Sequence, residues 1–393
     1  MNATGKSLRN AFIYICVFFL APLPLAKAES GASSYEAMRR QENDIAVTLV
    51  VSGLAGTGAR FAEDIRNVVN DMQPGGVRVL PVLGNGGLQN LNDVFFLKSI
   101  DMGIVGEDNL RLLEKKNPRL YAGIGRRIQY ITKLYNSEFH VLARNDITSF
   151  DDLRGKKVDF SLKDSPTEAS AEFIFDALKI NVEHTNYDVF EAIDKLRRGE
   201  ISAMIILTGA PQAAVLRQFT KNDRVHFLAL DRESLPNHDL NTIFANYLPA
   251  EITHQEYPNL VPEGTAVPTV ASRALLVAYA WPEGSARYNK IANFVDAFFS
   301  KIDQFHNVAR HSKWKEVNLA AEMPGWTRFK PAAEWLAAHR NTAESEMRRA
   351  FERFIQNYSA STGRKSLSAS DQELLYSRFM RYFEAQKMGQ TAH

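Results

Sequence analysis

A glycine-rich turn after the first apolar run is the first place where residue types and spacing could support chemistry. Gly53 and Gly58 have the spacing of a phosphate-binding P-loop. However, Ala59 and Arg60 stand where that loop needs Lys and Ser or Thr. A dinucleotide fingerprint fails as well, because its third glycine would fall at Phe61. Two interpretations remain: a loop whose N–H groups bind a small anion at a helix N-terminus, or a simple tight turn.

The segment Ser165-Pro166-Thr167-Glu168 predicts a second helix start of interest. Ser165 fits the N-cap, Pro166 the first helical position, and Glu168 can reach back to complete a capping box. Capping alone would account for these residues. Alternatively, the Thr167 hydroxyl and the helix N-terminus form an anion-binding arm, and one such arm on each of two domains would make a clamp.

Catalytic and metal-binding patterns are missing from the sequence. His306 and His311 are five residues apart, so they do not share a helix face, and no carboxylate completes a zinc pattern. No nucleophile elbow is present. We therefore expect a protein that is not an enzyme and that carries no cofactor or metal.

Strand-like and helix-like segments alternate from residue 45 onward, which places these turns in a fold. Parallel strands need crossover helices, so this order predicts an α/β fold with a parallel or mixed, doubly wound sheet. Ligands bind such sheets at the carboxyl ends of the strands, where the glycine-rich turns fall. The expected elements are strands at 45–51, 77–83, 102–105, 139–144, 201–207, 225–230 and 274–281, and helices at 61–69, 89–98, 189–198 and 286–299, with two more beginning at 165 and 211.

The N-terminus predicts an export signal. Lys6 and Arg9 precede an apolar stretch from Ala11 to Leu25, and Ala26-Lys27-Ala28 places small residues at a cleavage site before Glu29. A membrane anchor is the alternative, but the apolar stretch is shorter than the roughly 20 residues of a spanning helix. Cleavage removes three cations and no acid, so the net charge falls from +2 to −1. We expect a periplasmic, monomeric protein that does not bind nucleic acid.

Length and composition agree with this interpretation. The chain has 393 residues, 45% of them hydrophobic, which suits two domains with their own cores. The single cysteine, Cys16, lies inside the predicted signal, so disulfide and thiol chemistry are excluded from the mature chain. Residues 341–393 carry two amphipathic helical patterns, which either pack back on the body or bind a partner.

The order of these segments resembles that of the TAXI-type solute-binding proteins of TRAP transporters. The resemblance covers residues 45–336 and is collinear. It rests on Gly53-Leu54-Ala55-Gly56-Thr57-Gly58, Asn85-Gly86-Gly87-Leu88-Gln89-Asn90-Leu91, Asp101-Met102-Gly103-Ile104-Val105, His140-Val141-Leu142-Ala143-Arg144, Asp152-Leu153-Arg154-Gly155-Lys156-Lys157-Val158, Gly199-Glu200-Ile201-Ser202-Ala203, Thr208-Gly209-Ala210-Pro211 and Tyr257-Pro258-Asn259-Leu260.

The resemblance implies a two-lobed, periplasmic-binding-protein type II fold with a ligand cleft between the lobes and a C-terminal helical extension. Lobe 1 would comprise residues 44–143 with 248–340, lobe 2 residues 144–247, and the extension residues 341–393. The implied function is to capture a small carboxylate-bearing anion and deliver it to a TRAP membrane permease. The alternatives are a binding protein for an ABC importer or a sensor kinase, or an interaction protein that has lost ligand binding.

The resemblance also implies where the ligand would be bound. Arg60 either adds positive charge to the cleft or is solvated, because it departs from the aromatic residues usual in the family after the first loop. The implied site residues are Gly56, Thr57, Gly58, Asn85, Gly86, Gly87 and Asn90 in lobe 1 and Ser165, Thr167, Thr208, Gly209 and Pro211 in lobe 2.

Overall fold

A computed structural model describes residues 26–53, 56–73, 75–339, 351, 355, 371–372 and 374–378. The chain divides into two compact units, residues 1–43 and 44–393. Helix α1 (Ala26–Ile45) makes up the described part of the first unit, so the polar segment after the predicted cleavage site is helical. The predicted signal at residues 1–25 lies outside the described residues. In the described ranges, no helix is both long and apolar enough to cross a membrane.

The second unit begins as the alternating pattern predicts. It contains strands β1 (Ala46–Val51), β2 (Arg78–Leu83) and β3 (Met102–Gly106), which are joined by helices α2 (Thr57–Val69) and α3 (Gly87–Phe96). Strand β1 pairs in parallel with both β2 and β3. Helix α4 (Asn109–Lys116) and the 3₁₀-helix η1 (Ile124–Arg126) follow. We call the part of the unit built on these three strands lobe 1.

A second α/β part follows further along the chain, and we call it lobe 2. Its strands β5 (Lys157–Asp159), β6 (Glu183–Thr185) and β7 (Ala203–Thr208) are parallel, and β8 (Val225–Phe227) pairs with β4 at the side. Its helices are η2 (Phe150–Leu153), α5 (Pro166–Leu178), α6 (Val189–Arg198), α7 (Ala213–Gln218) and α8 (Asn241–Phe244). Helix α6 has the predicted bounds because its apolar positions repeat with the helical period.

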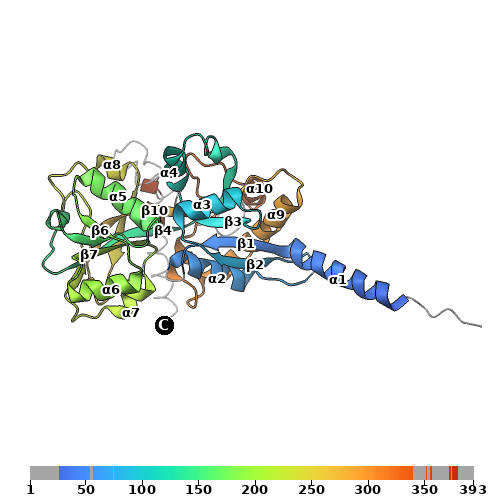
Figure 1. Cartoon of the computed structure of the whole chain (residues 1–393), viewed down its shortest axis with the longest axis horizontal. Helices are drawn as coiled ribbons and strands as arrows, with labels where there is room; N and C mark the ends of the chain where they lie inside the picture. The colour runs from blue at the N-terminus through green and yellow to red at the C-terminus, as the bar shows by residue number, and fades with distance from the viewer. Residues whose placement is uncertain are drawn as a thin grey trace, which may run out of the picture. The chain divides into compact units, whose positions relative to one another are not determined.

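Two long strands connect the lobes (Figure 1). Strand β4 (Ile128–Arg144) pairs with β10 (Ala266–Tyr279) through its first part and with β7 and β8 through its second part. Strand β10 pairs with β9 (Leu248–Thr253) before it reaches β3. The strand order is therefore β2-β1-β3-β10-β4 in lobe 1, continuing through β4 to β7-β5-β6 in lobe 2. The predicted two-lobed α/β fold class is confirmed, and the proposed boundaries at residues 143/144 and 247/248 remain a proposal.

Each lobe buries apolar side chains on both faces of its sheet. In lobe 1, one core lies under α2 and α9 (Ala286–Phe299), and the other lies under α3 and α4. In lobe 2, α5 and α8 cover one core and α6 and α7 the other. The sheet and the four cores described above all lie within residues 44–393.

The chain after α9 returns along lobe 1. It forms η3 (Ile302–His306), η4 (Ser312–Glu316) and α10 (Lys330–Ala338). In the C-terminal extension, Phe351 packs edge-on against Tyr376, and Arg378 binds Glu251 of β9 at 2.6 Å. These contacts fit the interpretation that the extension packs back on the body. The rest of the extension lies outside the described residues.

Candidate functional site

A cavity lies where the two lobes meet, with a volume of about 80 Å³. Its walls come from the loops before α2 and α3, from the middles of β4 and β10, and from α5 and the end of β7. The lining residues are Ser52, Gly56, Thr57, Gly58, Gly86, Gly87, Ile104, Val105, Gly106, Tyr135, Ser137, Pro166, Leu207, Thr208, Ser272, Arg273 and Ala274. Three helix N-termini therefore meet at one cavity, two from lobe 1 and one from lobe 2.

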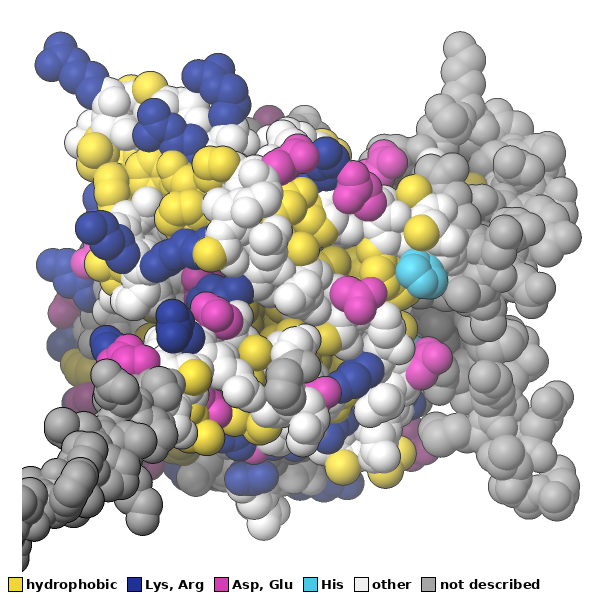
Figure 2. Space-filling view, turned by 90° about the vertical axis from the view of Figure 1, so that its right-hand side faces the viewer, with side chains coloured by type: hydrophobic (Ala, Val, Ile, Leu, Met, Phe, Trp, Pro, Cys, Tyr) yellow, Lys and Arg dark blue, Asp and Glu magenta, His cyan; other side chains and the backbone are white. Residues whose placement is uncertain are grey.

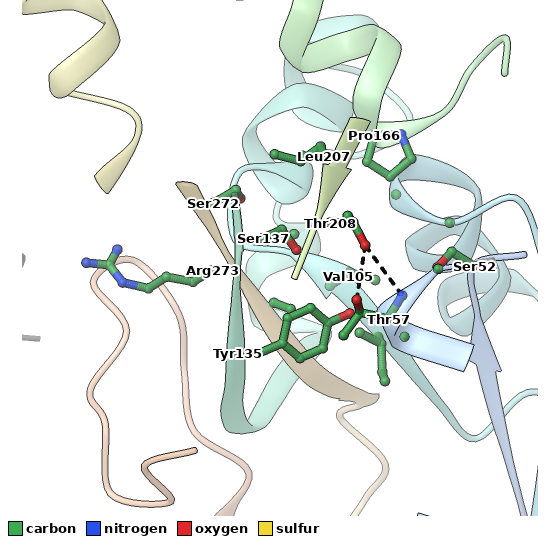
Figure 3. Close-up of a pocket in the computed structure, with 17 residues that line it drawn as sticks. Ser52, Thr57, Val105, Tyr135, Ser137, Pro166, Leu207, Thr208, Ser272 and Arg273 are labelled. Atoms are coloured by element: carbon green, nitrogen blue, oxygen red, sulfur yellow. Dashed lines mark hydrogen bonds between the residues drawn. The ribbon is translucent and has the colours of Figure 1, made fainter. Parts of the chain in front are cut away.

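Thr57 and Thr208 join the lobes directly at this cavity. Their hydroxyl oxygens are 3.0 Å apart, and Thr57 also donates a hydrogen bond from Oγ1 to the carbonyl oxygen of Gly209 at 2.9 Å. Figure 3 shows the two threonines facing each other beside Tyr135. Two of the side chains predicted to bind ligand from opposite walls are thus bonded to each other, and the lobes are closed at this point.

A second closure point lies beside the first, between the turn before α3 and the start of α5. Gly87 has φ +49°, and a Cβ added to it would lie 2.7 Å from Cγ of Pro166. Pro166 can therefore pack on the turn only because residue 87 is a glycine, which has a hydrogen in place of Cβ. The start of α5, which is the predicted lobe 2 arm of the clamp, touches the turn before α3 here.

Replacing Gly87 with alanine is expected to separate the lobes at this point and to destabilise the protein by about 1–3 kcal/mol. The cost combines backbone strain at positive φ with the clash against Pro166. Small-angle scattering should show a larger radius of gyration, and urea unfolding should show the loss of stability.

Gly155→Ala is the matched control, because Gly155 has φ +69° but open space around its Cβ position. It should cost stability through strain and leave the radius unchanged. Adding Pro166→Ala to Gly87→Ala should restore the smaller radius. If Gly87→Ala and Gly155→Ala have the same radius, the close approach does not control closure.

Several other predicted site residues support the cavity without lining it. Asn90 is fully buried, accepts a hydrogen bond from Gly86 N and donates one to Ile104 O. Ser165 caps α5 by accepting from Glu168 N, as predicted. The predicted capping box is not completed, because the Glu168 side chain accepts from Asp164 N and the Ser165 N–H donates to Leu162 O. Thr167 accepts from Leu207 N through its hydroxyl oxygen and so fixes α5 to the end of β7.

The remaining predicted residues lie further out. Asn85 is exposed, Pro211 is half-buried before α7, and Gly209 contributes its carbonyl to the threonine contact. Arg60 is also outside the lining, since its guanidinium binds Glu63 and the carbonyl of Ala309 on the outer side of α2. Of the two interpretations of Arg60, its contacts favour a surface role.

The cavity residues that the sequence did not reveal include polar residues of β4 and β10. Tyr135 and Ser137 belong to the part of β4 before the predicted strand, and Ser272 and Arg273 belong to the part of β10 before its predicted start. The only sequence signal at these positions is a short polar stretch within an otherwise apolar strand. Arg273 supplies the single charged side chain of the lining, and its guanidinium is paired with Glu107 at 2.6 Å. Figure 3 shows it extending away from the threonine pair.

A buried charged cluster lies behind Gly209. The ammonium group of Lys313, from η4, is 2.6 Å from Glu138 Oε1 on β4 and 3.1 Å from Glu316 Oε1, with Glu256 at 3.9 Å. Glu138 Oε2 also accepts a hydrogen bond from Ala210 N of lobe 2. Burial raises the pKa of Glu138 to about 7, although Lys313 opposes the rise. Burial by itself lowers the pKa of Lys313, but the three carboxylates outweigh it and raise this pKa above its ordinary value.

His140 extends this cluster into lobe 2. Its Nδ1 lies 2.8 Å from the carbonyl oxygen of Glu138, and its Nε2 lies 3.0 Å from the hydroxyl of Tyr257. That hydroxyl accepts a hydrogen bond from Gln212 N, so it can donate its own proton to Nε2. Burial lowers the pKa of His140 to about 4. The histidine is therefore neutral at pH 7. In that state its two ring nitrogens can form both of these hydrogen bonds.

Two lobes joined by shared strands, with a cavity between them, are the arrangement of the periplasmic-binding-protein type of fold. The chain belongs to the NMT1-like family, whose model matches residues 63–326. The sequence matches no curated protein.

Solved structures with similar folds are remote in sequence. One is the substrate-binding protein of an amino acid ABC transporter (13% identity, 65% of this chain and 93% of that chain, TM-score 0.39). Another is a TctC solute-binding protein from Polaromonas (14%, 66% and 88%, TM-score 0.39). A third is the aliphatic sulphonate-binding protein SsuA from Escherichia coli (15%, 75% and 78%, TM-score 0.35).

Proposed function

We propose that this protein is the periplasmic solute-binding component of a TRAP-type transporter of the TAXI type. In this role it would capture a small carboxylate-bearing anion between its lobes and deliver it to a membrane permease. One observation carries the proposal: the N-termini of α2, α3 and α5 meet at a cavity whose lining, among the residues that the structure describes, includes one arginine and no carboxylate. Exposed N–H groups and the positive ends of helix dipoles favour an anion there.

Capture requires the lobes to separate first. A cavity of about 80 Å³ is smaller than the roughly 300–1,000 Å³ usual for ligand sites. The Thr57–Thr208 contact would break on opening, which frees both hydroxyls and the Thr57 N–H for a carboxylate. Strands β4, β9 and β10 are the segments near the lobe junction, so we propose that the hinge lies in them.

The cavity residues suit binding rather than catalysis. Hydroxyl groups and backbone N–H groups can hold a carboxylate by charge-assisted hydrogen bonds. The lining contains no histidine and no acidic residue beside its hydroxyls, so it offers no base to activate a nucleophile. We therefore propose no enzymatic role. An ABC importer or a sensor kinase would use the same fold and cavity, and the genes next to this one would identify the partner.

A second candidate function also has a specific observation in its favour. The two lobes bond to each other through Thr57 and Thr208 and pack through Gly87 and Pro166. An interaction protein that has lost ligand binding would retain such contacts between its lobes. Ligand binding itself separates this candidate from the first.

Thermal unfolding of residues 29–393 against dicarboxylates, 2-oxoacids, amino acids, phosphonates and sulfonates tests the proposal. The protein is first refolded to remove any bound solute. A ligand at 100 times its dissociation constant should stabilise the protein by about 2.7 kcal/mol. Thr57→Val should weaken binding of a carboxylate about tenfold, because it removes one hydrogen bond to a charged group.

Thr265→Val is the control, since the Thr265 hydroxyl donates to Pro262 O at an exposed position away from the cavity. It should leave binding unchanged. A protein that melts cooperatively and gains no stability from any compound contradicts solute capture and supports the second candidate.

A further inference from the structure

An exposed apolar patch lies on lobe 1, away from the cavity. Phe96 and Leu97 at the end of α3 are 49% and 48% exposed, and Leu120 after α4 is 50% exposed. Figure 2 shows hydrophobic side chains at the upper left of the viewed face with Lys and Arg side chains around them. Large apolar side chains exposed together in this way mark an interaction surface.

Aromatic contacts hold the patch in place. The rings of Phe95 and Phe96 meet edge to face at 4.5 Å, and both lie 6.3 Å from the ring of Tyr121. The Tyr121 hydroxyl donates to Asn92 Oδ1 at 2.7 Å and so ties the loop after α4 to helix α3. The two segments that form the patch, residues 95–98 and 119–127, are therefore fixed side by side.

The patch has a positively charged border. Its two segments contain four exposed cations and no acidic residue. The guanidinium of Arg127 also lies over the Phe95 ring at 5.8 Å. The four cations are Lys98, Arg119, Arg126 and Arg127.

The nearest acidic residues along the chain lie outside the two segments. Asp93, one turn before Phe96 on α3, is half-buried and bonded to Gln89. Glu114 on α4 is followed directly by Lys115 and Lys116. The patch thus combines apolar side chains at its centre with a clear excess of positive charge.

We propose that this basic apolar patch, formed by Phe96, Leu97, Leu120, Lys98, Arg119, Arg126 and Arg127, docks lobe 1 onto an anionic lipid bilayer. Phenylalanine and leucine side chains enter the boundary between headgroups and acyl chains, while arginine and lysine stay among anionic headgroups. Charge complementarity selects the occupant, because cations around exposed apolar side chains match a negatively charged lipid surface. Docking goes beyond solute capture and does not depend on it.

Sedimentation with vesicles tests the proposal. Residues 29–393 are mixed with vesicles of phosphatidylglycerol and phosphatidylethanolamine, or with vesicles of phosphatidylcholine alone, at low and high salt. We expect binding to the anionic vesicles that weakens with salt, and little binding to phosphatidylcholine. The double variant Phe96→Ser/Leu97→Ser should bind at least about tenfold more weakly. Removing the charge of Arg119 or Arg126 by substitution with Gln should weaken binding roughly fivefold each.

Matched surface changes on lobe 2 are the controls. Phe190 is 54% exposed, similar to Phe96, and Lys221 is an exposed cation. Phe190→Ser and Lys221→Gln should leave vesicle binding unchanged, and all variants should melt within a few degrees of the parent. The proposal is overturned if the parent binds neither vesicle, if it binds both equally, or if the lobe 1 and lobe 2 variants lose binding alike. A parent that instead binds an acidic peptide but no vesicle would also overturn it, in favour of a protein partner.

Discussion

Replacing Lys313 with methionine is expected to lower the free energy of unfolding by about 3–5 kcal/mol. The substitution leaves Glu138 and Glu316 buried without the cation that neutralises them, and an uncompensated buried charge is among the costliest single changes. Glu138 also accepts a hydrogen bond from Ala210 in lobe 2, so the damage falls on the contact between the lobes. Urea unfolding at pH 7.5 measures the effect.

The pH dependence of this variant identifies the cause. Without Lys313, the folded-state pKa of Glu138 rises further above its unfolded value near 4.5, so the protonated carboxyl fits the folded protein best. The destabilisation caused by Lys313→Met should therefore shrink as the pH falls from 7.5 to 5. Lys330→Met removes an exposed cation paired with Glu283 at 2.7 Å and should cost less than about 1 kcal/mol. If Lys313→Met were as stable as Lys330→Met, the ion pairs of Lys313 with the buried carboxylates would not stabilise the protein.

His140 is expected to make the folded protein lose stability in acid. Its pKa is about 4 in the folded state, against about 6.5 for an unfolded chain. Because folding lowers this pKa, the contribution is fully present above pH 6.5 and is lost as the pH falls toward 4. The full loss is on the order of 3 kcal/mol, of which about 2 kcal/mol falls between pH 7.5 and pH 5.

The measurement compares His140→Gln with the parent at both pH values. The variant is less stable at pH 7.5, because it loses the hydrogen bond with Tyr257, but its further loss on acidification should be about 2 kcal/mol smaller. His311 also loses stability in acid, since burial lowers its pKa to about 4, and it stays in both proteins. Equal acid sensitivity in His140→Gln and the parent would contradict a neutral buried His140.

The sequence predicted best the elements whose patterns are local. Helices α6 and α9 have the predicted bounds, because their apolar positions form clear helical stripes. The early parts of β4 and β10 were missed. The early part of β4 pairs mainly with the later part of β10, and the early part of β10 pairs with β9. Distant segments of the chain therefore determine these parts, rather than a local alternation of side chains.

The candidate site divides in the same way. The turns at Gly56 to Gly58 and at Gly86 and Gly87 are visible in the sequence, because glycine spacing is a local signal. The cluster around Lys313 was not visible, since Lys313 and Glu138 meet only when η4 packs against β4. A lysine in a short polar segment of the sequence is predicted to be exposed to solvent. Its burial depends wholly on long-range packing.

The shared strand β10 also has a consequence for the order in which the protein can fold. In lobe 1 it lies between β3 and β4, yet it follows the whole of lobe 2 in the chain. During synthesis, β3 and β4 cannot pair with β10 until lobe 2 has been made. The loop that this pairing closes contains the whole of lobe 2, and closing so long a loop is slow. Lobe 1 therefore cannot complete its sheet until β10 has been made, whereas lobe 2 can begin earlier. Because β10 appears only in the last third of the chain, lobe 1 stays without a complete sheet for most of the time that the chain is being made.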